Sequence, residues 1–329
     1  MRAFMVKYFL IAAAASCFTT SNAIAPSLGL VRRQDVAFAE PIEILECIDF
    51  KSLDGLYTPL PATSESNTAC GLYIVGDLTT RIKVEFVDFS VDCDGGHVVG
   101  VLDGWEQGGS TFPPVEDLTA EGTRNRHSTF CGRTRPRRTF YSSGNFALIQ
   151  YKLAPSDGFT VRVTFEDNLT PCNGVALGDE GQFELRNFGR RSNCSVMIIH
   201  PQQLQISYMN VGKQRIRLTG LRALRPQRSQ IFAKAPDSTS TDDDCTHLIK
   251  LKDYTEVLGG LTWSVGQMHS YGHVCGIQEM SSPQNNFCET TVVRLVSSGH
   301  YNNVVAVEHG KVSAEDPQYR KSVCPARAA

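Results

Sequence analysis

Apolar and polar residues alternate along much of the chain, a pattern that predicts β-strands. Every second residue of 159–165 is apolar and the residues between them are polar. Period-two alternation is typical of a strand with one face in a core and the other in water. Residues 82–86 alternate in the same way, but the phase then slips by one position at Val87. Such a slip sends side chains to the opposite face, so we expect a β-bulge near Val87.

Turn-forming residues separate these patterns at short intervals. Residues 146–153 and 291–296 are apolar with less alternation, as expected for strands inside a sandwich. No long amphipathic helix is predicted, and closely spaced strands indicate antiparallel sandwiches and not a parallel α/β fold. The predicted turns are Asp94-Gly95-Gly96, Asp103-Gly104, Ser156-Asp157-Gly158 and Gly259-Gly260.

Two modules are indicated by a coarse internal repeat. Each half opens with two cysteines about 20 residues apart, a spacing at which a disulfide could add about 3 kcal/mol, and ends in strands rich in Val and Phe. The predicted divisions are an N-terminal segment at 24–44, a first domain at 45–168 and a second domain at 169–329. Within the second, residues 235–244 read APDSTSTDDD, which predicts a flexible acidic loop because little there can be buried.

The start of the chain resembles a secretory signal peptide. A basic start precedes an apolar core at 9–15, and small residues follow. Cleavage after Ala23 is expected, giving a signal peptide of residues 1–23; cleavage after Ala25 would place Pro26 at the new N-terminus. The apolar run is short of the roughly 20 residues that span a bilayer. We therefore expect a secreted, extracellular protein without a membrane anchor.

Charge excludes some classes of partner. The 32 Lys and Arg nearly balance the 34 Asp and Glu, for a formal net charge of -2. No strong field would draw in nucleic acid or an anionic membrane, so neither is expected as a partner.

Cysteine content predicts a disulfide framework. Eleven cysteines occur, and Cys17 lies inside the predicted signal peptide, which leaves ten. An even count in a secreted chain favours disulfides, although spacing alone leaves the pairing open. No C-x-x-C occurs, which argues against zinc ribbons and thioredoxin-type redox sites.

Signs of catalysis or of a metal site are weak, so we expect a protein that is not an enzyme and takes no cofactor. The chain has no G-x-S-x-G elbow and no H-E-x-x-H helix. His269, His273 and Cys275 have a spacing that superficially suits a metal. Because Cys275 is needed for a disulfide, no metal site is predicted there.

Arginine clusters leave two interpretations open. They could bind a sulfated glycan or an acidic peptide, or they could be solvated loops. The first group is Arg124, Arg126, Arg133, Arg135, Arg137 and Arg138, and the second is Arg215, Arg217, Arg222, Arg225 and Arg228.

Two sequons predict N-glycosylation, at Asn193 and at Asn168. Asn193 is the favoured position, because Pro171 follows the Asn168 sequon. Cys194 stands in the middle of the Asn193 sequon and would hinder modification if its disulfide closed first.

Several stretches, taken in order, are similar to the corticotropin-releasing factor-binding protein family. The similarity extends over 46–324 and includes every cysteine in that range. The stretches are VDCDGG at 91–96, VLDGW at 101–105, SSGNFA at 142–147, RSNCS at 191–195 and TVVRLVSSG at 291–299.

This resemblance implies an all-β fold of two tandem CUB-like antiparallel β-sandwich domains. It also implies that the protein captures a CRF-like peptide hormone (CRF, urocortin or a CRF-like diuretic hormone) outside the cell and limits receptor activation. CRF-like hormones are amphipathic helices when bound, so a captor needs an apolar groove with a polar rim. The implied disulfides are Cys47–Cys70, Cys93–Cys131, Cys172–Cys194, Cys245–Cys275 and Cys288–Cys324.

The resemblance also suggests Asp49 as a peptide-binding residue. The chain departs from the family pattern at Glu43, where a basic residue is expected. Calcium-binding CUB domains place a carboxylate where Gly96 and His97 stand here, which leaves Asp88 without partner ligands. A calcium site in the first domain is therefore not expected.

An alternative function is an extracellular CUB-type adhesion module that binds glycans or matrix proteins through the arginine-rich loops. Glycan binding through many arginines would weaken strongly at high salt, whereas capture of an apolar helix face would largely survive.

Overall fold

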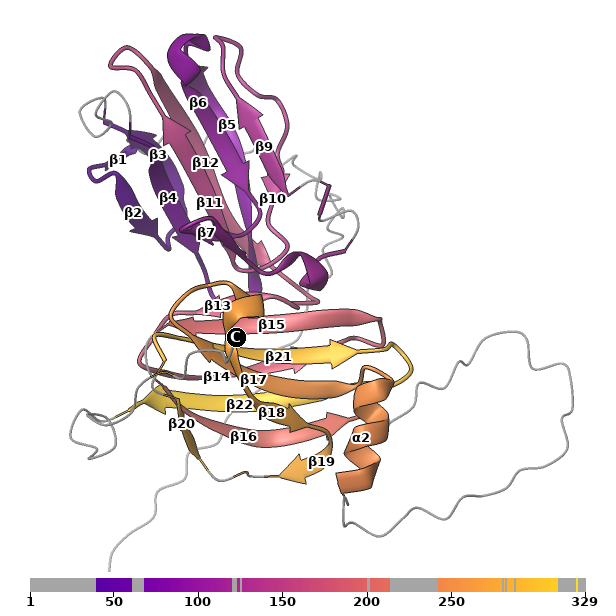
Figure 1. Cartoon of the computed structure of the whole chain (residues 1–329). Helices are drawn as coiled ribbons and strands as arrows, with labels where there is room; N and C mark the ends of the chain where they lie inside the picture. Colours follow the sequence, from indigo (N-terminus) through magenta and orange to yellow (C-terminus); the bar gives the residue numbers. More distant parts are fainter. Residues whose placement is uncertain are drawn as a thin grey trace, which may run out of the picture. The chain divides into compact units, whose positions relative to one another are not determined.

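The computed structural model consists mainly of β-strands, as the alternation predicts (Figure 1). The predicted signal peptide, most of the 24–44 segment and the second arginine group lie outside the described residues. The structure describes residues 40–60, 68–119, 123–124, 126–199, 202–213, 242–279, 281, 283–286, 288–312 and 324.

Two five-stranded sheets form the first sandwich. One sheet has the order β1 (Ile42–Ile44), β3 (Gly55–Pro59), β12 (Gly158–Asp167), β5 (Thr80–Ser90) and β10 (Phe140–Tyr141). The other has the order β2 (Ile48–Lys51), β4 (Cys70–Val75), β11 (Phe146–Lys152), β6 (Val98–Leu102) and β9 (His127–Phe130). A hairpin of β7 (Trp105–Gln107) and β8 (Ser110–Phe112) follows β6, and the turns include the short 3-10 helices η2 (Asp94–Gly96) and η3 (Val115–Asp117).

Alternating side chains fill the space between these sheets. Phe159, Val161 and Val163 of β12 are buried while Arg162 is exposed. β12 and β5 pair antiparallel, and their register shifts so that Val87 has no partner of its own. The bulge expected at Val87 is confirmed.

The second sandwich repeats this arrangement. Its first sheet has the order β13 (Gly174–Ala176), β15 (Ser192–Ile199), β21 (Thr290–Ser297), β17 (Tyr254–Gly260) and β18 (His269–Val274). Its second has β14 (Glu180–Arg186), β22 (Val304–Lys311), β16 (Gln202–Val211) and β19 (Gly276–Glu279), with β20 (Gln284–Asn286) also pairing with β16. The remaining elements are α2 (Asp242–Lys250) and the 3-10 helix η4 (Val265–Gln267). Most pairs in both sandwiches are antiparallel, and the predicted all-β class of two tandem sandwiches with five disulfides is confirmed.

The structure differs from the sequence-based expectation at the Gly259-Gly260 pair and at the end of the acidic run 235–244. Gly259 and Gly260 do not form a turn but end strand β17, where a side chain on Gly259 would come within 2.8 Å of the Cys288 sulfur. These glycines are needed for close packing and not for chain reversal. Of the acidic 235–244 run, residues up to 241 lie outside the described chain and the last three begin α2, a position where acidic residues are favourable.

Disulfides join the ten cysteines in the order that the family resemblance implies. Cys47–Cys70 and Cys172–Cys194 each tie a strand to the start of its sandwich, with sequence separations of 23 and 22. The other three pairs are Cys93–Cys131, Cys245–Cys275 and Cys288–Cys324.

A third apolar core joins residues of both sequence halves, within the compact unit that runs from Ala39 to Ala329. It combines Trp105, Phe112 and Phe146 of the first half with Met197 and Trp263 of the second. We call this group the junction core.

Buried polar contacts flank the junction core. Asn145 accepts a hydrogen bond from the Val175 backbone N–H (2.9 Å) and donates to the Gly76 carbonyl (2.7 Å). The Arg294 guanidinium pairs with Asp117 (Nε to Oδ1, 3.0 Å) and with Glu256 (Nη1 to Oε1, 3.2 Å). The Asp117 side chain is fully buried, so its carboxylate depends on Arg294 and on the hydrogen bond that the Ser195 hydroxyl donates to it.

Replacing Arg294 tests this contact. The Arg294→Leu variant leaves two carboxylates, of Asp117 and Glu256, buried without their cation. We expect the free energy of unfolding, measured by urea denaturation, to fall by about 3–5 kcal/mol. The matched control is Arg186→Leu, which breaks an exposed ion pair with Glu184 and should cost at most about 1 kcal/mol. Equal, small losses in both variants would show that the junction does not depend on Arg294.

Candidate functional site

Strand β2 stands at one end of its sheet and pairs with β4 alone among the strands of that sheet. The pairing is parallel, with Ile48 opposite Gly71. The Cys47–Cys70 disulfide fixes the start of the strand, and the Gly71 N–H donates to the Cys47 carbonyl at 2.7 Å. The strand is therefore an edge whose position is set by a covalent bond.

Large apolar side chains are exposed around this edge. Leu45 is 65% exposed, Ile48 49% and Phe50 52%. Ile48 and Phe50 are two residues apart and so lie on the same face of β2. Large apolar side chains exposed together on one strand edge can mark an interaction surface. We call Leu45, Ile48 and Phe50 the β2 patch.

Aromatic rings beneath the patch hold Phe50 in place. Its ring stacks on Tyr73, with 5.0 Å between centroids, and meets the edge of Trp105 at 5.8 Å. Trp105 is fully buried, and its indole N–H donates to the carbonyls of Ile74 and Ala147. Trp263 stacks against Trp105 at 5.7 Å. Phe50 is therefore the exposed rim of the junction core.

Tyr73 supports this arrangement as a neutral hydrogen-bond donor. Its hydroxyl donates to the Glu106 carbonyl oxygen at 2.7 Å. Burial raises the pKa of Tyr73, and the Glu106 carboxylate raises it further. The hydroxyl therefore stays protonated at physiological pH. The Tyr73 ring is held by this hydrogen bond and by its stacking against Phe50.

Asp49 lies on the opposite face of β2 from Phe50. Its Oδ2 forms an ion pair with the Lys51 ammonium at 2.8 Å, and its Oδ1 accepts the Phe50 N–H at 2.7 Å. The carboxylate also adds, after burial and Asp54, to the raised pKa of Tyr57. The structure therefore places Asp49 on the same edge strand as the β2 patch but facing the other way, with a cation already bound.

Exposed acidic residues lie close to the patch in the sequence. Glu40, Glu43, Glu46 and Asp54 are all exposed. Asp54 is anchored because its Oδ1 accepts the Phe165 N–H at 2.7 Å. Glu43, where the family resemblance leads us to expect a basic residue, is one of these acidic residues. Residues 40–54 thus combine exposed apolar side chains with exposed carboxylates.

The histidines of the metal-like motif are not brought together as ligands. His273 Nε2 lies 3.4 Å from a Glu256 carboxylate oxygen, and Cys275 is bonded to Cys245. Within the described ranges, no group of three His, Cys, Asp or Glu could hold a metal ion.

His97, where calcium-binding CUB domains are expected to place a carboxylate, lies beside an acidic residue. Its Nδ1 lies 3.5 Å from Oδ2 of the buried Asp157. The same carboxylate accepts the backbone N–H groups of Asp92 and Ala154.

Both sequon asparagines are engaged in the folded chain. The Asn193 amide donates to the Glu116 carbonyl at 3.0 Å, and the Asn168 amide donates to the Ser143 carbonyl at 3.2 Å. A glycan on either nitrogen would change that contact, and glycosylation stays a prediction.

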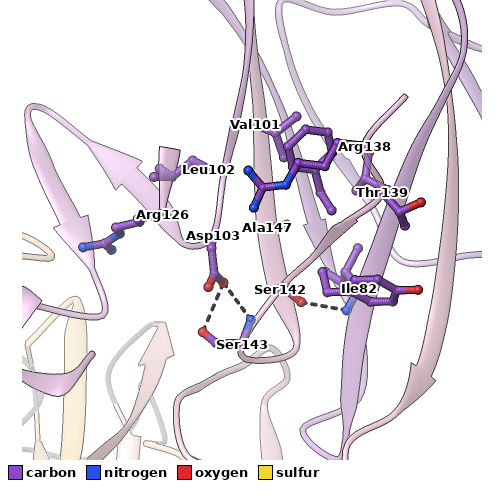
Figure 2. Close-up of a pocket in the computed structure, with 13 residues that line it drawn as sticks. Ile82, Val101, Leu102, Asp103, Arg126, Arg138, Thr139, Ser142, Ser143 and Ala147 are labelled. Carbon is purple, nitrogen blue, oxygen red and sulfur yellow. Dashed lines mark hydrogen bonds between the residues drawn. The ribbon is translucent and has the colours of Figure 1, made fainter. Parts of the chain in front are cut away.

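A cavity of about 250 Å³ opens where β10 faces β6, with Asp103 at one side (Figure 2). Asp103 accepts hydrogen bonds from the Ser143 N–H (2.8 Å) and hydroxyl (3.1 Å). Burial raises the pKa of Asp103, against the opposing effects of Ser143 and Arg126. The Ser142 hydroxyl is bonded to the Gly144 carbonyl and accepts the Ile82 N–H. The polar groups of Asp103 and Ser142 are thus already hydrogen-bonded within the protein. A ligand in the cavity would meet mainly apolar side chains.

Sequence reasoning reached Asp49 but not the β2 patch. Residues 42–50 carry apolar side chains at both strand phases, more than one buried face can accommodate. The excess of apolar residues in 42–50 could have predicted that some of them remain exposed at a sheet edge.

Comparison with known proteins identifies relatives of the chain. The family described as corticotropin-releasing factor binding protein N-terminal domain matches residues 42–167. The corticotropin-releasing factor-binding protein of Rattus norvegicus is 30% identical over 266 residues, covering 80% of this chain and 75% of that protein. The proteins of the same name from Mus musculus and Homo sapiens are 29% and 27% identical, each covering 84% of this chain and 79% of the relative.

Solved structures with similar segments include the CUB1-EGF-CUB2 domains of rat MASP-1. The match has 12% identity and a TM-score of 0.26, and covers 82% of this chain and 99% of that one. Separately, none of the helices in the described ranges has the length and apolar character to cross a membrane.

Proposed function

This chain belongs to the corticotropin-releasing factor-binding protein family, and on that premise we propose that it is an extracellular, non-catalytic protein that sequesters a CRF-like peptide hormone and limits receptor activation. Five disulfides support an oxidising, extracellular setting. The single observation that carries the proposed site is the exposed β2 patch above a fixed aromatic base.

The patch suits the apolar face of a peptide helix. An amphipathic helix presents side chains at positions i, i+3, i+4 and i+7, and binds by placing them against an apolar surface. Phe50 is held by Tyr73 and Trp105, so binding would immobilise little of the protein that is not already fixed. The main entropic cost then falls on the peptide.

The acidic residues near the patch in the sequence add a requirement on the ligand. Glu40, Glu43 and Glu46 are exposed and lie within ten residues of Ile48 and Phe50. Electrostatic complementarity then favours a hormone whose apolar face is flanked by Lys or Arg. Among CRF-like peptides, we propose that this chain prefers the more basic ones, and that the change of charge at Glu43 is part of that preference.

Asp49 supports the same requirement from the far side of the strand. In the free protein its carboxylate is paired with Lys51 at 2.8 Å. We propose that a basic group of the hormone replaces Lys51 as its partner, since a carboxylate can accept a guanidinium bidentately.

The Phe50→Ala variant is the direct test of the site. The unaltered protein should bind a basic CRF-like peptide with a Kd at or below about 100 nM, equivalent to about 10 kcal/mol. Removing the Phe50 ring should weaken binding by about 2 kcal/mol, roughly 30-fold, because a rigid aromatic anchor is lost. Isothermal titration calorimetry measures both values.

Ile277→Ala is the matched control for Phe50→Ala. Ile277 is 58% exposed, lies on β19 and is also a large apolar residue. Its loss should change the Kd less than about twofold. If the two substitutions had equal effects, the β2 patch would not be the binding surface.

Asp49 and Lys51 can be tested as a pair. Asp49→Ala should weaken the binding of a basic peptide by about 1–3 kcal/mol, because the peptide cation loses its partner. Lys51→Ala should leave binding unchanged or strengthen it, because a competitor for the carboxylate is removed. Titrations of both variants with the same peptide give the comparison. If Lys51→Ala weakened binding as much as Asp49→Ala, the ion pair would matter only for the shape of β2.

A further inference from the structure

Positive charge is concentrated in one part of the sequence. Residues 122–156 contain six arginines and one lysine but no Asp or Glu, although the whole chain has a formal net charge of -2. Four of these arginines lie between Cys131 and β10, and we call residues 132–139 the arginine loop. Such local asymmetry in a nearly neutral protein indicates a surface for an anionic partner.

The arginine loop is held beside β5 at both of its ends and bends at residues 133 and 134. At its start, Gly132 forms a bridge with Val91, whose N–H donates to the Gly132 carbonyl at 3.0 Å. At its end, Phe140 pairs with Val84. The seven residue steps from Val84 to Val91 are thus matched by eight steps from Gly132 to Phe140, so the loop follows the neighbouring strand closely. The Cys93–Cys131 disulfide fixes the end next to Gly132.

The side chains of this loop are presented outward. Arg133, Arg135, Arg137 and Arg138 are all exposed. Arg135 Nη1 donates to the Val87 carbonyl at 3.4 Å, and the Arg138 guanidinium lies 5.3 Å from the centre of the Phe140 ring. These contacts position two guanidinium groups without neutralising them.

No described acidic residue lies within ion-pair distance of the four guanidinium groups, in contrast to Arg81 and Arg186, which pair with Glu166 and Glu184. Glu85, which accepts a hydrogen bond from Thr139 at the end of the loop, is paired with Lys83 at 3.0 Å. The four charges are available to a ligand.

We propose that the arginine loop binds a sulfated glycosaminoglycan. Guanidinium groups match planar and tetrahedral oxyanions with paired N–H donors, so sulfate groups are suitable partners. Arg133, Arg135 and Arg137 are all exposed within five residues of one another, and several cations along a short segment suit a polymer that carries repeated anionic groups. The disulfides place the protein where sulfated polymers, and not nucleic acids, are the abundant polyanions.

An acidic peptide is the less favoured ligand. Specific peptide recognition combines charge contacts with apolar pockets or strand pairing. The exposed arginines of the arginine loop offer charge alone. Such a surface favours ligands of high charge density and does not distinguish peptide sequences.

This surface is separate from the β2 patch. In the two sheets of the first sandwich, β2 stands at one end of its order, and β10 and β9 stand at the other ends. The rings of Phe130 on β9 and Phe140 on β10 lie 5.5 Å apart, so those other ends face each other. The two surfaces thus lie at opposite edges, and glycan binding would hold the protein on a matrix while leaving the β2 patch free.

The test compares the full mature protein with Arg133→Gln/Arg135→Gln/Arg137→Gln on immobilised heparin. Arg138 is left in place because it contacts Phe140 and lines the cavity. The control is Arg162→Gln/Arg190→Gln/Arg191→Gln, which removes the same charge from other exposed positions. Melting temperatures and CRF-like peptide binding are measured for all three proteins, so that loss of fold and loss of the proposed hormone site are each recognised.

Heparin should retain the unaltered protein and the control, and the Kd of the loop variant should rise at least tenfold at 0.15 M salt. Because each contact releases a counterion, the slope of log Kd against log salt should fall by about 2–3 in the loop variant. Fully desulfated heparin and poly-glutamate should bind much more weakly than heparin. Equal retention of the loop variant and the control, or equal binding of poly-glutamate, would overturn the proposal.

Discussion

The structure depends on covering the outer apolar face of the sheet β2-β4-β11-β6-β9. Its inner face packs in the first sandwich, but the outer face also carries large apolar groups, among them Leu102 and Phe146. Water cannot be left in contact with that face without a large loss of hydrophobic stabilisation. The β7–β8 hairpin lays Trp105 and Phe112 on it, and Met197, Val292 and Trp263 of the second half complete the cover. The buried bond of Asn145 to Val175 and the pairing of Arg294 with Asp117 then fix the two halves in one register.

This constraint also explains where the proposed site lies. The cover ends at edge strand β2, where Phe50 stacks on Tyr73 but remains half exposed. An exposed ring supported by a buried one is rigid and apolar at once, which is what an anchor for a flexible peptide needs. The Cys47–Cys70 disulfide keeps the edge from fraying. The proposed hormone site is thus the uncovered margin of the junction core and not a separate pocket.

Local features were predictable from sequence because they follow from local geometry. Alternation along 159–165 identified β12, and the phase slip at Val87 identified a bulge that the register confirms. Gly259 and Gly260 were misinterpreted because the contacts that require them, with Cys288 and with Met268, come from residues outside the local turn pattern. The junction core was missed for the same reason, since nothing in the neighbourhood of Trp105 indicates that Trp263 will stack on it.

The candidate site likewise combines a residue that the sequence suggested with features that only the folded structure reveals. Asp49 came from family resemblance, and the sequence could not show that its carboxylate faces Lys51 while Phe50 faces the other way. Exposure of Leu45 and Ile48 is a property of the assembled edge and not of either residue. Hydrogen–deuterium exchange of the protein with and without a basic CRF-like peptide tests the central claim most directly. The account predicts slower exchange on peptide binding at residues 45–53 and at Tyr73, with little change in the arginine loop. Peptide binding with unchanged exchange at 45–53, and protection confined to the second sandwich, would contradict it.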